Sequence, residues 1–228
     1  MTINSTKWEE TTERFVVYLD IMGFKDKVAR QPHEKVYDDL KDVFNRALKF
    51  INEDGEKGIV KGVQFSDSII FFSRDNSEEC YSGIVRASTF FMENAMSKSY
   101  PMKGACAYGK ISINEDFQVF FGQPIIDAYL LHEEIHYYGI VAHHTFEEQV
   151  QKYGNANGAI LHTHTPMKAG KIYHSNIVWF FAEREKESLR IPNILNNLYA
   201  EVSGKPRVYV DNTQYMYDEY LKSENTDK

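Results

Sequence analysis

Cysteine is scarce in this chain of 228 residues, where Cys80 and Cys106 are the two that occur. Two cysteines are too few for the disulfide framework on which small extracellular domains depend. Each lies among apolar neighbours, which is typical of a small residue buried in a core. The sequence therefore excludes a disulfide scaffold and predicts a fold held by hydrophobic packing.

Long apolar runs and dense basic clusters are also missing. No run approaches the roughly 20 residues that span a bilayer, and the polar N-terminal segment lacks the apolar stretch of a signal peptide. The formal net charge of -7 and the scattered Lys and Arg residues disfavour DNA or RNA as a partner. We therefore expect a cytoplasmic protein that does not contact a membrane. A nucleotide remains possible as a ligand, because a small phosphate site needs only a few local donors.

The hydrophobic content is 43%, enough for one well-buried core, and the length favours one domain over two. We expect a polar N-terminal segment over residues 1–13 and a domain over 14–204. The remainder, 205–228, is expected to be a polar, Tyr-rich tail that packs on the domain or on a dimer partner.

The first half of the chain has a regular order of elements. The apolar run 15–21 predicts a buried strand, and apolar residues at three- and four-residue steps predict helices over 33–51 and 78–97. Residues 58–65 and 68–73 predict two strands joined tightly at Ser66 and Asp67, and 102–108 predicts a strand that Gly109 ends. This βαββαβ order predicts a ferredoxin-like α+β sheet with helices on one face.

The second half predicts a C-terminal β-α-β extension of that sheet. A hairpin comes first, and Pro124 suits the first turn of the helix that follows it. The expected elements are a hairpin over 111–113 and 118–121, a helix over 124–138, a strand over 140–142, a helix over 145–153, strands over 159–162 and 172–181, and a helix over 193–203.

Two aspartates occupy unusual places in this pattern. Asp20 closes an apolar strand, where a carboxylate is costly unless it is paired or binds a cation. Asp67 lies in the tight turn between two apolar strands. In a βαββ sheet the end of the first strand and the following hairpin turn are neighbours, so the two carboxylates are expected to converge. Such a pair suits Mg²⁺ or Mn²⁺, whose other ligands are substrate phosphates and water.

Four segments, in order, resemble the catalytic domains of class III adenylyl and guanylyl cyclases. Residues 20–24 (DIMGF) resemble the family's D-I-x-G-F motif, and 65–68 (FSDS) its second metal-binding hairpin, with Ser66 where the family usually has Gly. Residues 102–109 (MKGACAYG) resemble its M-R-V-G-I-H-x-G strand. Phe121 and Gly122, followed by Ala128, resemble its F-G-x-x-V-N-x-A-x-R segment.

The resemblance implies a role for each candidate residue. Asp20, the Ile21 carbonyl and Asp67 would hold two Mn²⁺ or Mg²⁺ ions in a homodimer with composite active sites. The candidate contacts to a ribonucleoside triphosphate are the backbone of Gly23 and Phe24 and the side chains of Lys103, Lys168, Asp127 and Tyr129. In the family, the lysine that matches Lys168 comes from the other subunit.

Departures from the family pattern bear on which nucleobase the substrate carries. The family's transition-state Asn and Arg fall on Ile126 and Leu130, and its purine-reading positions fall on Val63 and Val119. These departures, with wordings such as YLDIMGFKD and KGACAYGK, resemble the pyrimidine cyclases of bacterial anti-phage defence. That resemblance implies conversion of UTP or CTP to cyclic UMP or cyclic CMP, which a separate effector reads.

Three other hypotheses stay open from the sequence. One is a non-catalytic nucleotide-binding module of the same fold, which the lost Asn and Arg would suit. Another is a purine cyclase. A third is a diguanylate-type cyclase, against which the missing G-G-[DE]-[EF] hairpin argues, since FSDS stands in its place.

Overall fold

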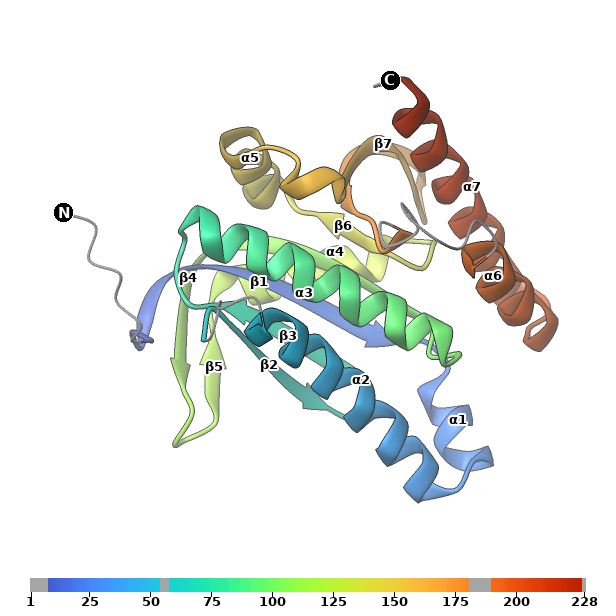
Figure 1. Cartoon of the computed structure of the whole chain (residues 1–228), viewed down its shortest axis with the longest axis horizontal. Helices are drawn as coiled ribbons and strands as arrows, with labels where there is room; N and C mark the ends of the chain where they lie inside the picture. The colour runs from blue at the N-terminus through green and yellow to red at the C-terminus, as the bar shows by residue number, and fades with distance from the viewer. Residues whose placement is uncertain (1–7, 54–57, 181–189, 227–228) are drawn as a thin grey trace.

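The computed structural model describes residues 8–53, 58–180 and 190–226, and they form one mixed sheet flanked by helices (Figure 1). Along the chain the elements are β1 Thr11–Ile21, α1 Phe24–Arg30, α2 His33–Glu53, β2 Val60–Phe65, β3 Ser68–Ser73, α3 Glu78–Ser97, β4 Met102–Asn114, β5 Val119–Phe121, α4 Gln123–Glu134, β6 Ile140–Ala142, α5 His144–Tyr153, a 3₁₀ turn Ala156–Gly158, β7 Ile160–Met167, β8 Gly170–Ile177, α6 Arg190–Glu201 and α7 Lys205–Thr226.

The sheet confirms the α+β, ferredoxin-like prediction. Its strand order is β2-β3-β1-β4-β6-β8-β7, and β5 pairs with β4. The first four strands give the order expected of a βαββαβ unit, with β1 antiparallel to both β3 and β4. Strand β1 lies between β3 and β4, so its apolar run is buried. Asp20, next to the last residue of β1, therefore lies between two neighbouring strands at one end of the sheet.

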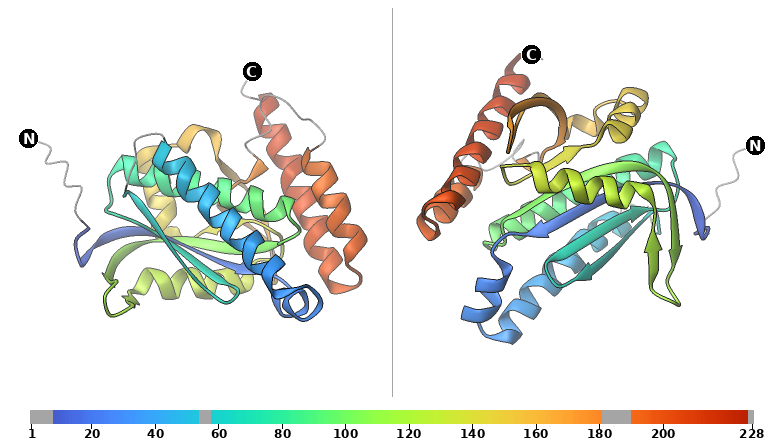
Figure 2. Two further views of the ribbon diagram at one scale, coloured as in Figure 1. Left: turned by 60° about the horizontal axis from the view of Figure 1, so that its bottom comes forward. Right: turned by 180° about the vertical axis from the view of Figure 1, so that it is seen from behind.

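The two helices of the βαββαβ unit lie on one face of the sheet, as expected, and the helix that follows the unit covers the other face. Helices α2 and α3 lie together on one face, and α4 lies on the other (Figure 2). Helix α4 packs on β4 and β1 because the residues beneath it, such as Ala105 and Ala107, are small. The face that carries Asp20 is therefore covered in part by α4.

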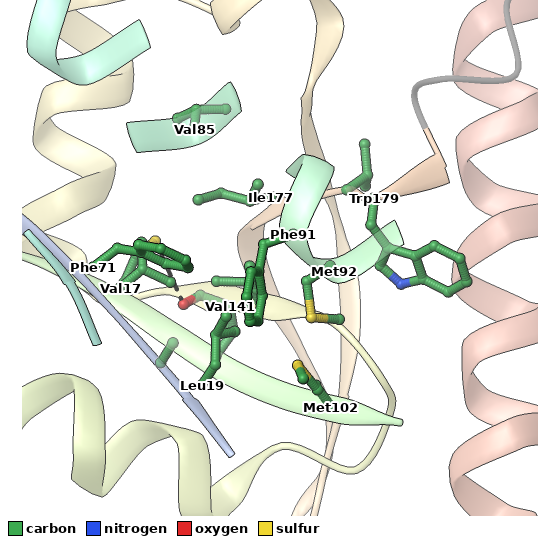
Figure 3. Close-up of a cluster of buried hydrophobic side chains, with 14 of the residues drawn as sticks. Val17, Leu19, Phe71, Val85, Phe91, Met92, Met102, Val141, Ile177 and Trp179 are labelled. Atoms are coloured by element: carbon green, nitrogen blue, oxygen red, sulfur yellow. Dashed lines mark hydrogen bonds between the residues drawn. The ribbon is translucent and has the colours of Figure 1, made fainter. Parts of the chain in front are cut away.

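The core lies between β1 and α3 (Figure 3). Alternate residues of β1, Val17 and Leu19, point toward Phe91 and Met92 of α3, as the two-residue period of a strand requires. Ser77 begins α3 by accepting a hydrogen bond from the Cys80 N–H at 3.3 Å. Because side chains alternate along a strand, Tyr18 and Asp20 face the opposite side of the sheet from Val17 and Leu19, toward α4.

Gly109 does not end a strand, contrary to the sequence expectation. Strand β4 continues through it to Asn114 and pairs with β1 along its length. A Cβ atom at Gly109 would lie 2.9 Å from Cγ of Pro124, so the close approach of α4 explains the glycine. The hairpin expected at 111–121 is present as the end of β4 and β5.

The C-terminal part is larger than a β-α-β unit. After β6, α5 and the β7–β8 hairpin come α6 and α7, which stand side by side at one edge of the molecule (Figure 1). The segment expected to be a tail is largely the helix α7, whose Tyr217 and Tyr220 pack on Phe180 at ring distances of 5.3 and 6.0 Å. Strand β8 ends at Ile177, and the expected end at residue 181 lies outside the described residues, as do residues 1–7 of the N-terminal segment.

Within the described ranges, none of the helices combines the length and the apolar character needed to cross a bilayer.

Candidate functional site

Asp20 and Asp67 come together at one end of the β1–β3 pair. Asp20 is the cross-strand partner of Ser68, the residue that follows Asp67. The next residue of β1, Ile21, donates its N–H to the Asp67 carbonyl at 3.0 Å. Ser66 supports the tight turn with a left-handed φ of 58°. Backbone pairing thus fixes the β2–β3 turn against the end of β1, as expected.

The environment of Asp20 disfavours an isolated carboxylate. Burial raises its pKa, and the nearby negative charge of Asp67 raises it further, while Lys103 opposes both effects. No hydrogen bond or ion pair joins either side-chain carboxylate to a residue in the described part of the chain. A divalent cation would supply the missing countercharge, so these residues fit a Mg²⁺ or Mn²⁺ site.

The protein ligands at such a site would be few. Among the described residues no group of three or more His, Cys, Asp or Glu side chains is arranged to hold a metal ion. Two carboxylates and the Ile21 carbonyl are a short ligand set. A set of this kind suits an ion whose coordination a bound triphosphate and water complete.

Lys103 lies beside Asp20 on β4, where the two are direct cross-strand partners. Its side chain is 5% exposed, and burial lowers its pKa. Glu133 and Asp20 act in the opposite direction, while Lys168 lowers the pKa further. The structure therefore places a buried cation beside Asp20, as a triphosphate contact would require.

Lys168 lies in the β7–β8 turn of the same chain, close enough to affect Lys103 electrostatically. Its backbone N–H donates to the Glu134 carbonyl at 2.7 Å, which ties the turn to the end of α4. The neighbouring Lys171 is occupied elsewhere, since its ammonium lies 3.2 Å from the centroid of the Tyr215 ring. Of these two lysines, Lys168 is the one whose charge acts on Lys103, the cross-strand partner of Asp20.

Gly23 and Phe24 form the turn that leaves β1. Gly23 has a left-handed φ of 72°, and its carbonyl accepts the N–H groups of Asp26 and Lys27 at the start of α1. A Cβ atom at Gly23 would meet nothing within 4 Å, so the space beside this backbone is open. The turn can be approached by a ligand, as contact with a triphosphate would require.

The α4 candidates do not all face the aspartates. The Tyr129 ring packs edge-on against Tyr18 at 5.5 Å and lies 5.0 Å from the His132 ring. Asp127 instead accepts a hydrogen bond from Gln123 at 2.8 Å. Burial lowers the pKa of His143, the residue before α5, and the charge of Asp127 opposes that effect. The structure thus brings Tyr129 onto Tyr18, which shares the Asp20 face of β1, and does not bring Asp127 there.

Two further residues of this site were missed from the sequence. The hydroxyl groups of Tyr18 and Ser68 share a hydrogen bond of 2.7 Å, which braces the turn that carries Asp67. Glu133, at the end of α4, lies near enough to raise the pKa of Asp20. Tyr18 could have been found, because it is two residues before Asp20 and so shares its face of the strand. The position of Glu133 depends on how α4 crosses the sheet.

No family model matches the sequence, and no curated protein matches it either. Solved structures do match the fold. The catalytic core of a rhodopsin-guanylyl cyclase with converted specificity, in complex with ATPalphaS, is similar with a TM-score of 0.55 and 13% identity, over 75% of this chain and 98% of that one. The guanylate cyclase domain of RhGC from Catenaria anguillulae, in complex with GTP, has a TM-score of 0.54 and 12% identity over the same shares.

A third similar structure is the non-canonical dimeric guanylyl cyclase domain of a RhoGC fusion protein from Blastocladiella emersonii. Its TM-score is 0.55 at 12% identity, over 74% of this chain and 98% of that one. At these identities the comparisons establish the fold, which is that of nucleotidyl cyclase catalytic domains.

Proposed function

We propose that this protein is a divalent-metal-dependent nucleotidyl cyclase whose substrate is a pyrimidine triphosphate, UTP or CTP. The observation that carries the proposal is the convergence of Asp20 and Asp67 on a fold shared with guanylyl cyclase domains. The reaction closes the ribose 3′-oxygen onto the α-phosphorus and releases pyrophosphate, giving cyclic UMP or cyclic CMP.

The chain's own groups have distinct tasks in this reaction. Asp20, the Ile21 carbonyl and Asp67 would hold two Mg²⁺ or Mn²⁺ ions. Ions bound there supply Lewis-acid chemistry, which lowers the pKa of the attacking hydroxyl and offsets phosphate charge. Lys103 and Lys168 bind phosphate oxygens as point charges. The Gly23–Phe24 backbone positions the triphosphate for in-line attack.

The preference for a pyrimidine is supported by the two positions where purine cyclases read the base. Val63 is half-buried on β2 and Val119 is 46% exposed on β5, and neither side chain can donate or accept a hydrogen bond. Val63 lines a cavity of about 340 Å³ in which Phe72 and Phe120 also take part. These two rings stack at 5.7 Å. A purine would lose the hydrogen bonds on which purine selectivity depends.

The proposed active unit is a homodimer that associates through α4 and β5. Ile126 and Leu130 of α4 are 51% and 58% exposed, and Phe121 of β5 is 64% exposed. Large apolar side chains gathered on adjacent elements are typical of an interface. Ile126 and Leu130 stand where the family has polar catalytic residues, so on this chain they are better suited to packing against a partner.

The biological setting follows from the resemblance to anti-phage pyrimidine cyclases. We propose that the product is a cytoplasmic second messenger in antiviral defence and that a separate effector recognises it. The phosphoryl chemistry and this setting are tested separately, since the first needs only purified protein.

Activity in aspartate variants tests the function. Purified protein with Mn²⁺ and UTP or CTP should release pyrophosphate and a cyclic nucleotide, and Asp67→Ala should abolish both products while the fold survives. Metal-dependent triphosphate binding without turnover would instead identify a non-catalytic nucleotide-binding module. Cyclic AMP or cyclic GMP as the main product would retain the cyclase and reject the pyrimidine preference.

A further inference from the structure

A cavity that does not include Asp20 or Asp67 lies between the β1–α1 segment and the α6–α7 helices. Its volume is about 490 Å³, within the range of sites that bind drug-sized molecules. One wall comes from the β1–α1 turn and α1, and the opposite wall from the end of α6 and the start of α7. Of the groups assigned to the proposed reaction, Gly23 lines this cavity, whereas the metal ligands Asp20, Ile21 and Asp67 do not.

The cavity combines an aromatic and aliphatic lining with a few polar groups. Tyr138 and Tyr209 stack at 5.5 Å with an interplanar angle of 24°, and Leu198 and Val202 add aliphatic surface. Burying a planar apolar body against this lining would remove it from water. An apolar wall of this kind with a small number of polar groups is the usual composition of a small-molecule site.

Two polar groups in the lining lack partners. The Oε1 atom of Gln31 is buried and accepts no hydrogen bond. A buried acceptor without a donor costs on the order of 1–3 kcal/mol. A ligand donor in the cavity would relieve that cost once the half-buried Gln31 side chain turns its amide oxygen toward the cavity. Lys205 is exposed at the rim and has no salt-bridge partner in the described ranges.

The other charged groups of the lining already have partners. Asp26 and Arg30 face each other at 4.0 Å, and Glu201 accepts a hydrogen bond from the Ser99 hydroxyl at 3.3 Å. Lys27 donates to the Ser99 carbonyl and lies over the Tyr100 ring. Lys205 is therefore the cation left for a ligand, and an anionic group suits it.

We propose that this cavity binds a small organic anion with an aromatic body and one hydrogen-bond donor, and that its occupancy alters the triphosphate site. The body lies against Tyr138 and Tyr209, the donor reaches Gln31, and the anionic group pairs with Lys205.

The link to the aspartates is a short run of backbone contacts. Met22 and Pro101 both line the cavity, and the Met22 N–H donates to the Pro101 carbonyl at 2.8 Å. The preceding residue, Ile21, donates to the carbonyl of Asp67. Gly23, a candidate triphosphate contact, lines the same cavity. A ligand in contact with Met22 would thus shift the β1–α1 turn, whose Gly23 backbone would bind the phosphates. This coupling rests on the proposed function.

The probe is 1-anilino-8-naphthalenesulfonate, which has an aromatic body, one amine N–H and one sulfonate, and whose fluorescence rises in apolar sites. We expect saturable binding to the folded chain, about tenfold weaker in Lys205→Glu. Val202→Trp, which narrows the cavity, should remove it. Lys152→Glu on α5 is the matched charge control, and Phe117→Ser removes an exposed ring elsewhere. Binding that is the same in Lys205→Glu and Val202→Trp as in the wild type would overturn the site.

Coupling is read separately, as the KM for the preferred triphosphate with and without saturating probe. We expect added probe to change the KM of the wild type and not that of Val202→Trp. Each protein is compared with itself without probe, because Val202 and Gly23 line the same cavity. Bound probe with an unchanged KM in the wild type would overturn the coupling. Because binding is measured by fluorescence, a chain without cyclase activity would still report on the cavity.

Discussion

The N–H of Ile21 donates to the Asp67 carbonyl at 3.0 Å, and this contact joins the end of β1 to the β2–β3 turn. Through it, two carboxylates that are 47 positions apart in the sequence (67 minus 20) become neighbours. The arrangement costs the unliganded protein stability and creates a place for a cation.

Removing the charge of Asp20 should stabilise the metal-free protein. Its pKa is raised on folding, so the folded state holds the proton more tightly than the unfolded state does. Stability therefore falls as pH rises from the unfolded pKa through the folded one. Asp20→Asn should unfold at a higher denaturant concentration than the wild type at pH 7 in EDTA. The difference should vanish below about pH 3.8, the ordinary pKa of Asp.

Mn²⁺ should reverse that order. The wild type should gain thermal stability as Mn²⁺ is added, because the ion binds the folded state alone. Asp20→Asn and Asp67→Asn should gain little, and turnover in each should fall by about 100-fold or more. Thermal unfolding with Mn²⁺ and with EDTA measures the first effect. An equal Mn²⁺ shift in all three proteins would contradict the site.

Lys103 should set the affinity for the triphosphate. Lys103→Met is expected to raise the KM by about 10- to 100-fold, the effect of losing one charged contact. Burial lowers the pKa of Lys103, so the cation should be lost at a lower pH than for an exposed lysine, and the wild-type KM should rise as the solution becomes alkaline. Lys103→Arg keeps its charge and should lack that rise. A KM that responds to alkaline pH equally in both proteins would exclude Lys103 as the titrating contact.

Gly104 should be intolerant of a side chain. A Cβ atom there would lie 2.3 Å from the Tyr18 carbonyl oxygen and 2.5 Å from Cδ2 of Leu19. Because the backbone of β1 must shift, Gly104→Ala should lower the free energy of unfolding by about 1–3 kcal/mol. Urea denaturation measures this loss. Gly154→Ala is not a suitable control, since its φ is left-handed; Ala107→Gly on the same strand compares the loss of a methyl group instead.

The dimer prediction concerns α4. Leu130→Asp, placed on a 58% exposed side chain, should leave the fold intact and convert the protein to a monomer with little activity. Light scattering coupled to size exclusion gives the oligomeric state. A wild-type protein that elutes as a monomer at micromolar concentration, with activity linear in enzyme, would contradict composite sites.

The sequence predicts the ferredoxin-like half of the fold well, because periodicity there is strong. The helix α3 was predicted over the residues it occupies, and β1 to β3 follow the expected order. The approach of Asp20 to Asp67 also followed, since strand order alone brings the end of β1 to the hairpin turn. These features depend on local pattern and on topology.

The features that were missed depend on packing between distant elements. A glycine such as Gly109 is typical of a turn in the sequence. In the structure it lies within a strand, and the close approach of Pro124 of α4 leaves no room for a side chain there. Asp127 and Tyr129 are two residues apart on α4, so they point to different sides of the helix, and Tyr129 packs against Tyr18. In α7, buried Val210, Thr213 and Tyr217 follow a helical spacing that the polar, Tyr-rich composition obscured.

The central claim is tested most directly by incubating the purified protein with Mn²⁺ and each of ATP, GTP, CTP and UTP, and identifying cyclic monophosphates by mass spectrometry. Cyclic UMP or cyclic CMP is the expected main product, and Asp67→Ala is expected to give none. No cyclic product from any of the four triphosphates, with the wild-type protein folded and bound to Mn²⁺, would contradict that claim.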